Sequence, residues 1–176
     1  ELNSLSSILG DDTLNKNTLE KTMNNIGNLE KAIGSVLGET ILAPIDSNQY
    51  HSLNNTYWRN DLKNNSSSKL PEGAIPIISK IEKNSILDIA LVGVGIVKDQ
   101  ETAYKLQKDL SFGQALTTSK GGLWRWDGFV QPQEVQNSYS ERLQQIARVR
   151  LLQKKLPTLK KEQDVIESKI SKNKYR

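Results

Sequence analysis

Seven cations near the C-terminus are the residues of this chain whose type and spacing could do chemistry. They are Arg142, Arg148, Arg150, Lys154, Lys155, Lys160 and Lys161. No Asp or Glu lies between Glu141 and Glu162, so the acidic partners that usually pair with such cations along a helix are missing. Cations without acidic partners favour non-specific contact with DNA phosphates, driven by counterion release and without reading of bases. The competing interpretation is the solvated face of a coiled coil, where charge is ordinary.

A second candidate is an interaction surface in the stretch GGLWRWDGFV, residues 121–130. It holds Trp124 and Trp126, two of the three tryptophans of the chain. Alternate side chains of a strand point the same way, so both indoles are expected on one face, opposite Arg125. Glycines on both sides permit close approach of another backbone. The stretch therefore predicts a strand whose tryptophan face is covered, either by its own subdomain or by another chain.

The residue types give no support to catalytic, cofactor or metal chemistry. Cysteine is absent and His51 is the only histidine, which excludes disulfides, thiolate ligands, cysteine nucleophiles and sites built from several histidines. The stretch GVGIVKD at residues 93–99 lacks the third glycine of a dinucleotide-binding fingerprint, and no P-loop pattern occurs. The sequence therefore predicts no catalytic residue, no metal and no cofactor, and a chain that is not an enzyme.

Hydrophobic spacing predicts the elements of the first half of the chain. Residues 18–37 have helical spacing, and Gly27 is expected to split them into two helices. The following stretch GETILAPID predicts a short strand ending at Pro44. Residues 47–69 are polar and indicate a loop.

The second half predicts strands around one helix. GAIPIISKIE, residues 73–82, indicates an edge strand because it carries a proline, and a short helix is expected after it. A strand at residues 93–97 and a helix capped by Asp99 follow. The remainder, up to Val130, predicts a β-hairpin with its turn at residues 119–122, where glycine supplies positive φ.

Both ends of the chain resemble coiled coil. Apolar residues at alternating spacings of three and four form a seam of about three heptads: Val149, Leu152, Leu156, Leu159, Ile166 and Ile170, extended upstream by Tyr139, Leu143 and Ile146. Pro157 interrupts this seam, and we expect a kink or break near residues 154–156. Leu2, Leu5 and Leu9 repeat the spacing at the other end. The two ends are therefore predicted to leave the globular part together as an antiparallel coiled coil.

Composition and charge agree with this layout. The chain has 176 residues and a net charge of +4, but residues 139–176 carry 11 Lys/Arg against 4 Asp/Glu, so the rest of the chain is net acidic. No apolar run approaches the length of a membrane span, and no signal peptide is indicated. The predicted fold class is α+β, with two small mixed subdomains flanked by an antiparallel coiled coil. The predicted division is a coil stub at 1–12, subdomains at 13–69 and 70–134, and a coil helix at 135–176.

Three stretches in this order resemble the hinge domain of bacterial SMC (structural maintenance of chromosomes) proteins. They are LVGVGIVKDQETAYKLQKDL, ALTTSKGGLWRWDGF and the basic helix SERLQQIARVRLLQKKL. The WRWDGF version is similar to the alphaproteobacterial branch, and LEKAIGSVLGETILAPID is similar to the helix and strand that open the hinge. The resemblance implies a homodimerisation module that joins two coiled-coil arms of a chromosome condensation and segregation protein. It also implies a cytoplasmic, nucleoid-associated protein whose ATP-binding heads and condensin-type accessory subunits belong to the full-length assembly.

The resemblance adds expectations for particular residues. Dimer contact is expected near the glycines and tryptophans of the second subdomain: Gly93, Gly95, Gly121, Gly122, Trp124, Trp126 and Gly128. DNA contact is expected at the seven C-terminal cations. The chain departs from the usual hinge in a shorter first subdomain, and it has Gln-Pro-Gln after Val130 where a glycine-rich run is usual. The alternative function is a free-standing, non-specific nucleic-acid-binding module that uses the basic helix.

Overall fold

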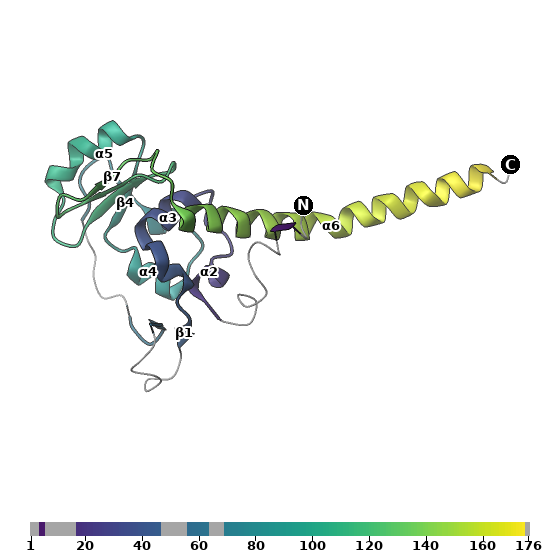
Figure 1. The fold of residues 1–176 in the computed structure, drawn as a ribbon, viewed down its shortest axis with the longest axis horizontal. Helices are drawn as coiled ribbons and strands as arrows, with labels where there is room; N and C mark the ends of the chain where they lie inside the picture. The colour runs from purple at the N-terminus through teal and green to yellow at the C-terminus, as the bar shows by residue number, and fades with distance from the viewer. Residues whose placement is uncertain (1–3, 6–16, 47–55, 64–68, 175–176) are drawn as a thin grey trace.

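The computed structural model describes residues 4–5, 17–46, 56–63 and 69–174 (Figure 1). The helices are α2 (Leu19–Thr22), α3 (Glu30–Leu37), α4 (Ser85–Ala90), α5 (Gln100–Leu106) and α6 (Ser138–Lys174). Short 3-10 helices are η2 (Gly38–Leu42), η3 (Ile77–Lys80) and η4 (Gln107–Asp109). The strands are β1 (Ile45–Asp46), β2 (Trp58–Arg59), β3 (Ile75–Pro76), β4 (Val94–Val97), β5 (Ala115–Thr118), β6 (Leu123–Arg125) and β7 (Val130–Gln131).

A mixed sheet of five strands, in the order β3-β4-β5-β6-β7, organises the second half of the chain. β4 and β5 are parallel and are joined through α5, while the other pairs are antiparallel. β5 lies in the middle of the sheet, and all four of its residues are buried. The predicted edge strand is confirmed as β3, which is short because Pro76 cannot donate a ladder hydrogen bond.

Caps and turns of the second half follow the sequence closely. The carboxylate of Asp99 accepts a hydrogen bond from the backbone N–H of Thr102 at 2.8 Å, which confirms the predicted cap of α5. Asn84 caps α4 in the same way through the N–H groups of Ile86 and Leu87. The β5–β6 hairpin is also confirmed, and Gly121 in its turn has a φ of +96°.

The first half is helical with little sheet. α2 and α3 are separated at Gly27, which has a φ of +60°, so the predicted split is confirmed. The predicted strand up to Pro44 is wrong, because residues 38–42 form the 3-10 helix η2. Apolar residues of this stretch pack in the core without pairing as a strand. Ile41, for example, is fully buried within η2. The extended part comes later, where β1 pairs in parallel with β2.

Two clusters of buried apolar side chains hold these elements. The larger cluster brings together Leu19, Met23, Ile26, Leu29, Ala32, Ile33, Ile41, Ile77, Ile86, Leu87, Leu91, Val94 and Leu143. The smaller cluster lies between α5 and the sheet and contains Val97, Ala103, Leu116 and Trp124. The larger cluster therefore takes residues from both sides of the predicted subdomain boundary at residues 69 and 70. That boundary stays a prediction.

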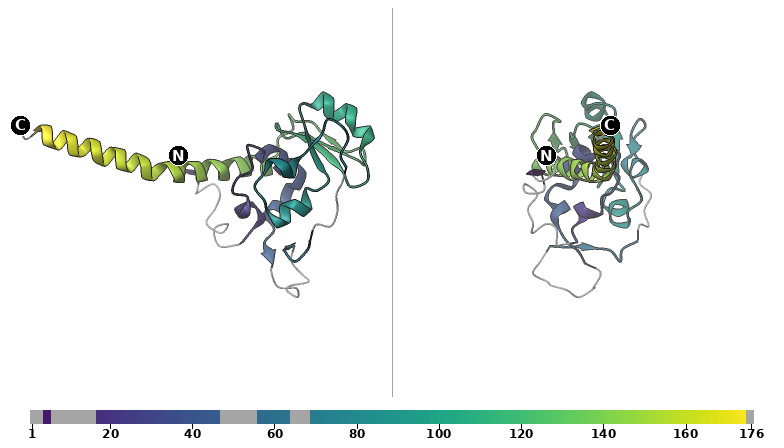
Figure 2. Two further views of the ribbon diagram at one scale, coloured as in Figure 1. Left: turned by 180° about the vertical axis from the view of Figure 1, so that it is seen from behind. Right: turned by 90° about the vertical axis from the view of Figure 1, so that its right-hand side faces the viewer.

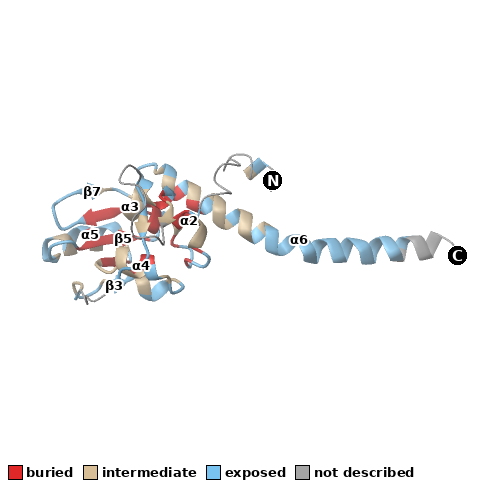
Figure 3. Ribbon diagram, turned by 90° about the horizontal axis from the view of Figure 1, so that it is seen from below, coloured by how far each residue is buried: buried red, intermediate tan, exposed pale blue. Residues whose placement is uncertain are grey.

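The 37-residue helix α6 starts against the globular part and then leaves it as an arm (Figures 1 and 2). Its first turns pack on α3, where a Cβ at Gly34 would come within 2.5 Å of the backbone of Ser140. Leu143 is buried in the larger cluster, whereas from Gln153 to Ser168 every residue of the arm is exposed (Figure 3). None of the helices in the described ranges is long and apolar enough to cross a membrane.

Of the kink or break predicted near residues 154–156, the break is wrong, since α6 runs through Pro157 as one helix. The kink stays a prediction. A proline inside a helix removes one backbone hydrogen bond and leaves the carbonyl of the residue four positions earlier without its partner. Here that carbonyl belongs to Gln153, and both Gln153 and Pro157 are exposed. Water can therefore reach the carbonyl, which lowers the cost of continuing the helix.

Candidate dimer and nucleic-acid interfaces

The base of α6 is tied to α2 by an ion pair. The guanidinium of Arg142 donates to both carboxylate oxygens of Glu20, at 2.7 Å through Nε and 2.9 Å through Nη2. The side chain of Glu20 is 2% exposed and that of Arg142 is 21% exposed. The hydrogen bond to Glu20 raises the pKa of Arg142 above its ordinary value, although burial acts in the opposite direction. This cation is therefore satisfied within the chain.

Arg150 makes a second tie, two turns further along α6. Its Nη2 donates to the carbonyl oxygens of Lys21 at 2.8 Å and Glu20 at 3.3 Å, and its Nη1 donates to the carbonyl of Met23. These carbonyls lie at the end of α2, where helix carbonyls lack partners in their own helix. Burial lowers the pKa of Arg150 from its ordinary value. Arg150 thus caps α2 through three hydrogen bonds to backbone carbonyls.

The sequence could not show these two contacts, because the partners lie 122 to 130 residues away along the chain. A search for acids three or four residues away on the same helix misses Glu20. The remaining predicted cations are exposed: Arg148, Lys154, Lys155, Lys160 and Lys161. Arg148 also interacts with another group of the chain, so it is not a free cation. The prediction of phosphate contact therefore depends mainly on the four lysines of the arm.

A groove lined by both polar and apolar residues runs beside the base of the arm. It has a volume of about 490 Å³ and lies between α6 and the segment that connects α2 to α3. Its walls include the amide side chains of Asn24, Asn25 and Asn28 on one side and the cations Arg148 and Lys154 on the other. Amides and cations can bind phosphate oxygens, but Glu30 also lines the groove and would repel them, so the groove adds little to the prediction of phosphate contact.

The predicted glycines of the dimer contact are mostly occupied by contacts within the chain. A Cβ at Gly93 would lie 3.1 Å from the carbonyl of Gly113, and one at Gly95 would lie 2.9 Å from Ala74. At Gly122 it would clash with the ring of Trp124. Gly121 is buried as well, next to Lys31 and Ser35. The close approach that these glycines permit is therefore made by the chain itself.

The two indoles differ in burial although both lie beside residues of α5, so the chain itself covers the predicted tryptophan face at Trp124 and leaves Trp126 partly exposed. β6 ends at Arg125; Trp124 is 2% exposed in the smaller core, whereas Trp126 lies beyond the strand and is 40% exposed. The Trp126 ring contacts the ring of Phe112, with 4.4 Å between centroids. Of the seven predicted contact residues, Trp126 and Gly128 are the exposed ones.

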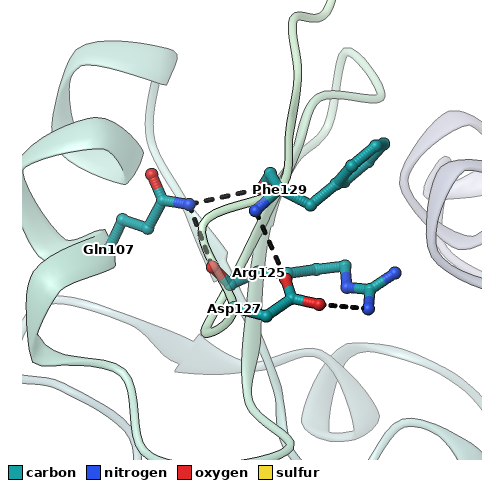
Figure 4. A network of polar contacts seen from close by, with 4 residues as sticks. All are labelled: Gln107, Arg125, Asp127 and Phe129. Atoms are coloured by element: carbon teal, nitrogen blue, oxygen red, sulfur yellow. Dashed lines mark hydrogen bonds and ion pairs between the residues drawn. The ribbon is translucent and has the colours of Figure 1, made fainter.

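The turn between β6 and β7 is held by side chains (Figure 4). The amide of Gln107 donates to the carbonyls of Arg125 at 2.9 Å and Phe129 at 3.2 Å. The carboxylate of Asp127 forms an ion pair with Arg125 and accepts the N–H of Phe129 at 3.3 Å. The Arg125 guanidinium lies 5.5 Å from the centroid of the Phe129 ring. Sequence reasoning did not single out Phe112 or Phe129; a pair of phenylalanines in otherwise polar loops was the available signal.

The outer part of the apolar seam, from Leu156 onward, is exposed in the part of the chain that the structure describes. Leu156, Leu159, Ile166 and Ile170 are 42–60% exposed. Of the three leucines predicted to cover the seam, only Leu5 lies in the described ranges, and it is half-buried. Leu2 and Leu9 lie outside them. The antiparallel coiled coil therefore stays a prediction, although the seam and the helix that carries it are present.

Comparison with known proteins places this geometry beside one family. Over 120 residues, 68% of its length, the chain is 32% identical to the chromosome partition protein Smc of Rhodopseudomonas palustris. Over 128 residues it is 29% identical to Smc of Cereibacter sphaeroides. The matches span 10% and 11% of those proteins, so the chain corresponds to a small part of its curated relatives. No family profile matches the chain.

The fold has a counterpart among solved structures. It is similar to the SMC hinge domain of Geobacillus stearothermophilus, solved as an asymmetric dimer, with a TM-score of 0.58. The alignment covers 97% of this chain and 79% of the other at 15% sequence identity. At that identity the likeness concerns the fold. It includes both the globular part and the long helix, because nearly all of the chain is aligned.

Proposed function

Because the chain belongs to the SMC hinge family, a non-catalytic module of chromosome partition proteins, we propose that it homodimerises and so joins two coiled-coil arms. The two arms would meet at the hinge, far from the ATP-binding heads of the full-length protein. In the cell this protein would be associated with the nucleoid and with condensin-type accessory subunits. It would take part in chromosome condensation and segregation.

The observation that carries this proposal is the arm. α6 leaves a small globular part, and its exposed face carries an apolar seam at heptad spacing. A helix with an exposed seam over several turns needs a partner helix, since isolated surface helices do not expose such stripes in water. A small domain with a coil attached is suited to linking long arms. The predicted coil segments at 1–12 and 135–176 and the subdomains at 13–69 and 70–134 belong to this proposal.

The oligomeric state tests the proposal. Light scattering at low and high salt should give the mass of two chains, because a contact based on apolar side chains resists salt. A monomer at micromolar concentration in both buffers would contradict the proposed function. The alternative, a free-standing nucleic-acid-binding module, requires no dimer and predicts that monomer.

A second function, non-specific DNA contact, is favoured by the exposed lysines of the arm. Lys154, Lys155, Lys160 and Lys161 lie on two adjacent parts of α6, with no acid among the residues between Glu141 and Glu162. Exposed lysines are free to exchange counterions for phosphates, so binding should weaken steeply with salt.

Charge reversal tests DNA contact. The double variant Lys154→Glu/Lys155→Glu should weaken binding to a fluorescent duplex equally for all sequences and should flatten the salt dependence. The matched control Lys63→Glu/Lys69→Glu makes the same change in net charge at exposed lysines away from the arm. Equal effects of the two double variants would mean that overall charge, and not the arm, governs binding.

A further inference from the structure

A group of exposed apolar side chains gathers at the end of the sheet that lies away from the arm. We call it the distal aromatic patch, and its members come from α5, the loop before β5, and the β6–β7 turn. They are Tyr104 (71% exposed), Phe112 (86%), Trp126 (40%), Phe129 (48%) and Val130 (38%). Single exposed apolar residues are ordinary, but a contiguous group of rings marks an interaction site.

Two rings of the patch are in contact with each other, and a third lies beside a cation. Phe112 and Trp126 form a tilted pair with 4.4 Å between centroids. Phe129 lies under the guanidinium of Arg125. Trp126 and Tyr104 also line a shallow depression together with Lys108 and Gly128. Aromatic rings beside arginine are the residue types that dominate the binding energy of protein interfaces.

The base of the patch is held in place before any partner arrives. Gln107 binds the carbonyls on both sides of the β6–β7 turn, and Asp127 binds both Arg125 and the N–H of Phe129 (Figure 4). On the inner side, Trp124 and Leu106 pack in the smaller core. A surface with a fixed backbone loses little conformational entropy on binding, which favours affinity.

The charges around the patch favour a protein partner over nucleic acid. Lys105 pairs with Glu101, and Arg125 pairs with Asp127. Lys108 and Asp109 lie next to each other in η4. Cations and acids are therefore equal in number here, so phosphates would meet as much repulsion as attraction. A surface with both signs can also face a copy of itself, because a twofold axis can bring each sign against the other.

The area of the patch is suited to a second copy. Five large side chains that expose roughly 100 Å² each would contribute about 500 Å², against about 800 Å² per partner in a standard protein interface. The surrounding surface of α5 and the turn can supply the rest. The edge of β7 contributes little, because this strand has two residues and is followed by Pro132, which lacks an N–H.

We propose that the distal aromatic patch contacts a second copy of this chain, with Phe112 and Trp126 as its anchors. This inference rests on the proposed homodimer and assigns a surface to it. The assignment differs from the glycine-centred contact expected from the sequence, since most of those glycines are occupied within the chain. Aromatic anchors take the place of close backbone approach.

The experiment is sedimentation equilibrium of three purified variants beside the wild type. Phe112→Ser and Trp126→Ser remove the anchors, and Phe112 is so exposed that its loss leaves the fold intact. Leu62→Ser removes a 47%-exposed leucine elsewhere on the surface and serves as the matched control. Circular dichroism checks that each variant is folded. The dimer dissociation constant should rise about 30-fold or more in both aromatic variants and stay unchanged in the control.

Each outcome decides a different point. A wild-type dimer with unchanged dissociation constants in both folded aromatic variants overturns the patch and leaves the proposed dimerisation standing. A wild-type monomer contradicts the proposed function itself. The last measurement uses a fluorescent oligothymidine. If the wild-type protein binds it, and Phe112→Ser abolishes this binding while the dimer stays intact, the patch is a site for unpaired bases and the proposal is overturned.

Discussion

The base of α6 and the distal aromatic patch differ in burial, and the difference is the opposite of what residue type alone predicts. Charged groups are engaged inside the chain at the base of α6, and aromatic rings are exposed in the patch. At the base of the arm, the guanidinium groups of Arg142 and Arg150 are engaged within the chain, and Glu20 is buried with them. At the distal end, phenylalanine and tryptophan rings are exposed. Burial of charge is costly unless every polar group has a partner, and here the partners are a carboxylate and three helix-end carbonyls.

The contrast indicates that the two regions have different tasks. The paired charges at the base require particular geometry, so they set the direction in which the arm leaves the globular part. The exposed rings require cover, so they are suited to a partner outside the chain. Hydrogen bonding orients the arm, and the exposed apolar surface is the proposed site of attachment.

The largest expected effect separates the two indoles. Trp124→Ala should lower the free energy of unfolding by about 3–5 kcal/mol because it empties the smaller core. Trp126→Ala should cost far less, since its ring is 40% exposed. Urea unfolding followed by circular dichroism measures both. Similar losses for both variants would mean that Trp126 is a core residue and that the distal patch is smaller than described.

A smaller but substantial effect is expected at the base of the arm. Glu20→Ala leaves the Arg142 guanidinium without its carboxylate, and we expect a loss of about 3 kcal/mol, the low end for breaking a buried pair, because Arg142 keeps contact with water. Glu20→Gln should recover part of this loss by accepting one hydrogen bond. The control is Asp61→Ala, which breaks the exposed Arg59–Asp61 pair and should change unfolding little.

Arg150 should have a smaller effect than Glu20, since α2 is short and water can replace some of its bonds. Arg150→Ala should cost about 1–3 kcal/mol by leaving carbonyls at the end of α2 unsatisfied. Hydrogen exchange of α2 should increase while that of α5 stays constant. Lys155→Ala on the exposed side of the same helix is the control, and equal exchange in the two variants would contradict the cap.

The smallest expected effect concerns pH and lies near the patch. The hydrogen bond from the N–H of Thr102 holds the pKa of Asp99 below its ordinary value. A carboxylate with a lowered pKa stabilises the folded state above its unfolded pKa, and this contribution is lost as the pH falls through the folded pKa. Asp99→Asn keeps the cap without titrating, so its acid unfolding should lack this step. Identical acid profiles of the wild type and Asp99→Asn would rule out a contribution from the Asp99 charge.

Local patterns predicted most of the second half of the fold. The Asp99 cap, the hairpin around Gly121 and the proline-limited edge strand depend on residues within a few positions of one another. The failures share a cause. The strand expected up to Pro44 is the 3-10 helix η2, and the strand expected to carry both tryptophans ends at Arg125, because packing against the rest of the chain decides where short elements stop.

The candidate surfaces were predicted less well than the fold. The basic segment on α6 was recognised, but its division into engaged arginines and exposed lysines depends on Glu20, far away in the chain. The glycines were recognised as sites of close approach, but the approaching groups belong to the same chain. A sequence shows that a residue can make a contact, but it does not show which other residue makes that contact with it.

The sequence by itself determined the layout of this protein: a small α+β body, a long heptad helix, an excess of positive charge at one end, and residue types that favour binding over catalysis. These properties follow from periodicity, turn chemistry and composition, which act over a few residues. The tertiary structure alone decided that Arg142 and Arg150 face α2, that Trp124 is core, and that Phe112 and Trp126 meet at the surface. Such pairings join residues distant along the chain, and only the packing of the whole chain brings them together.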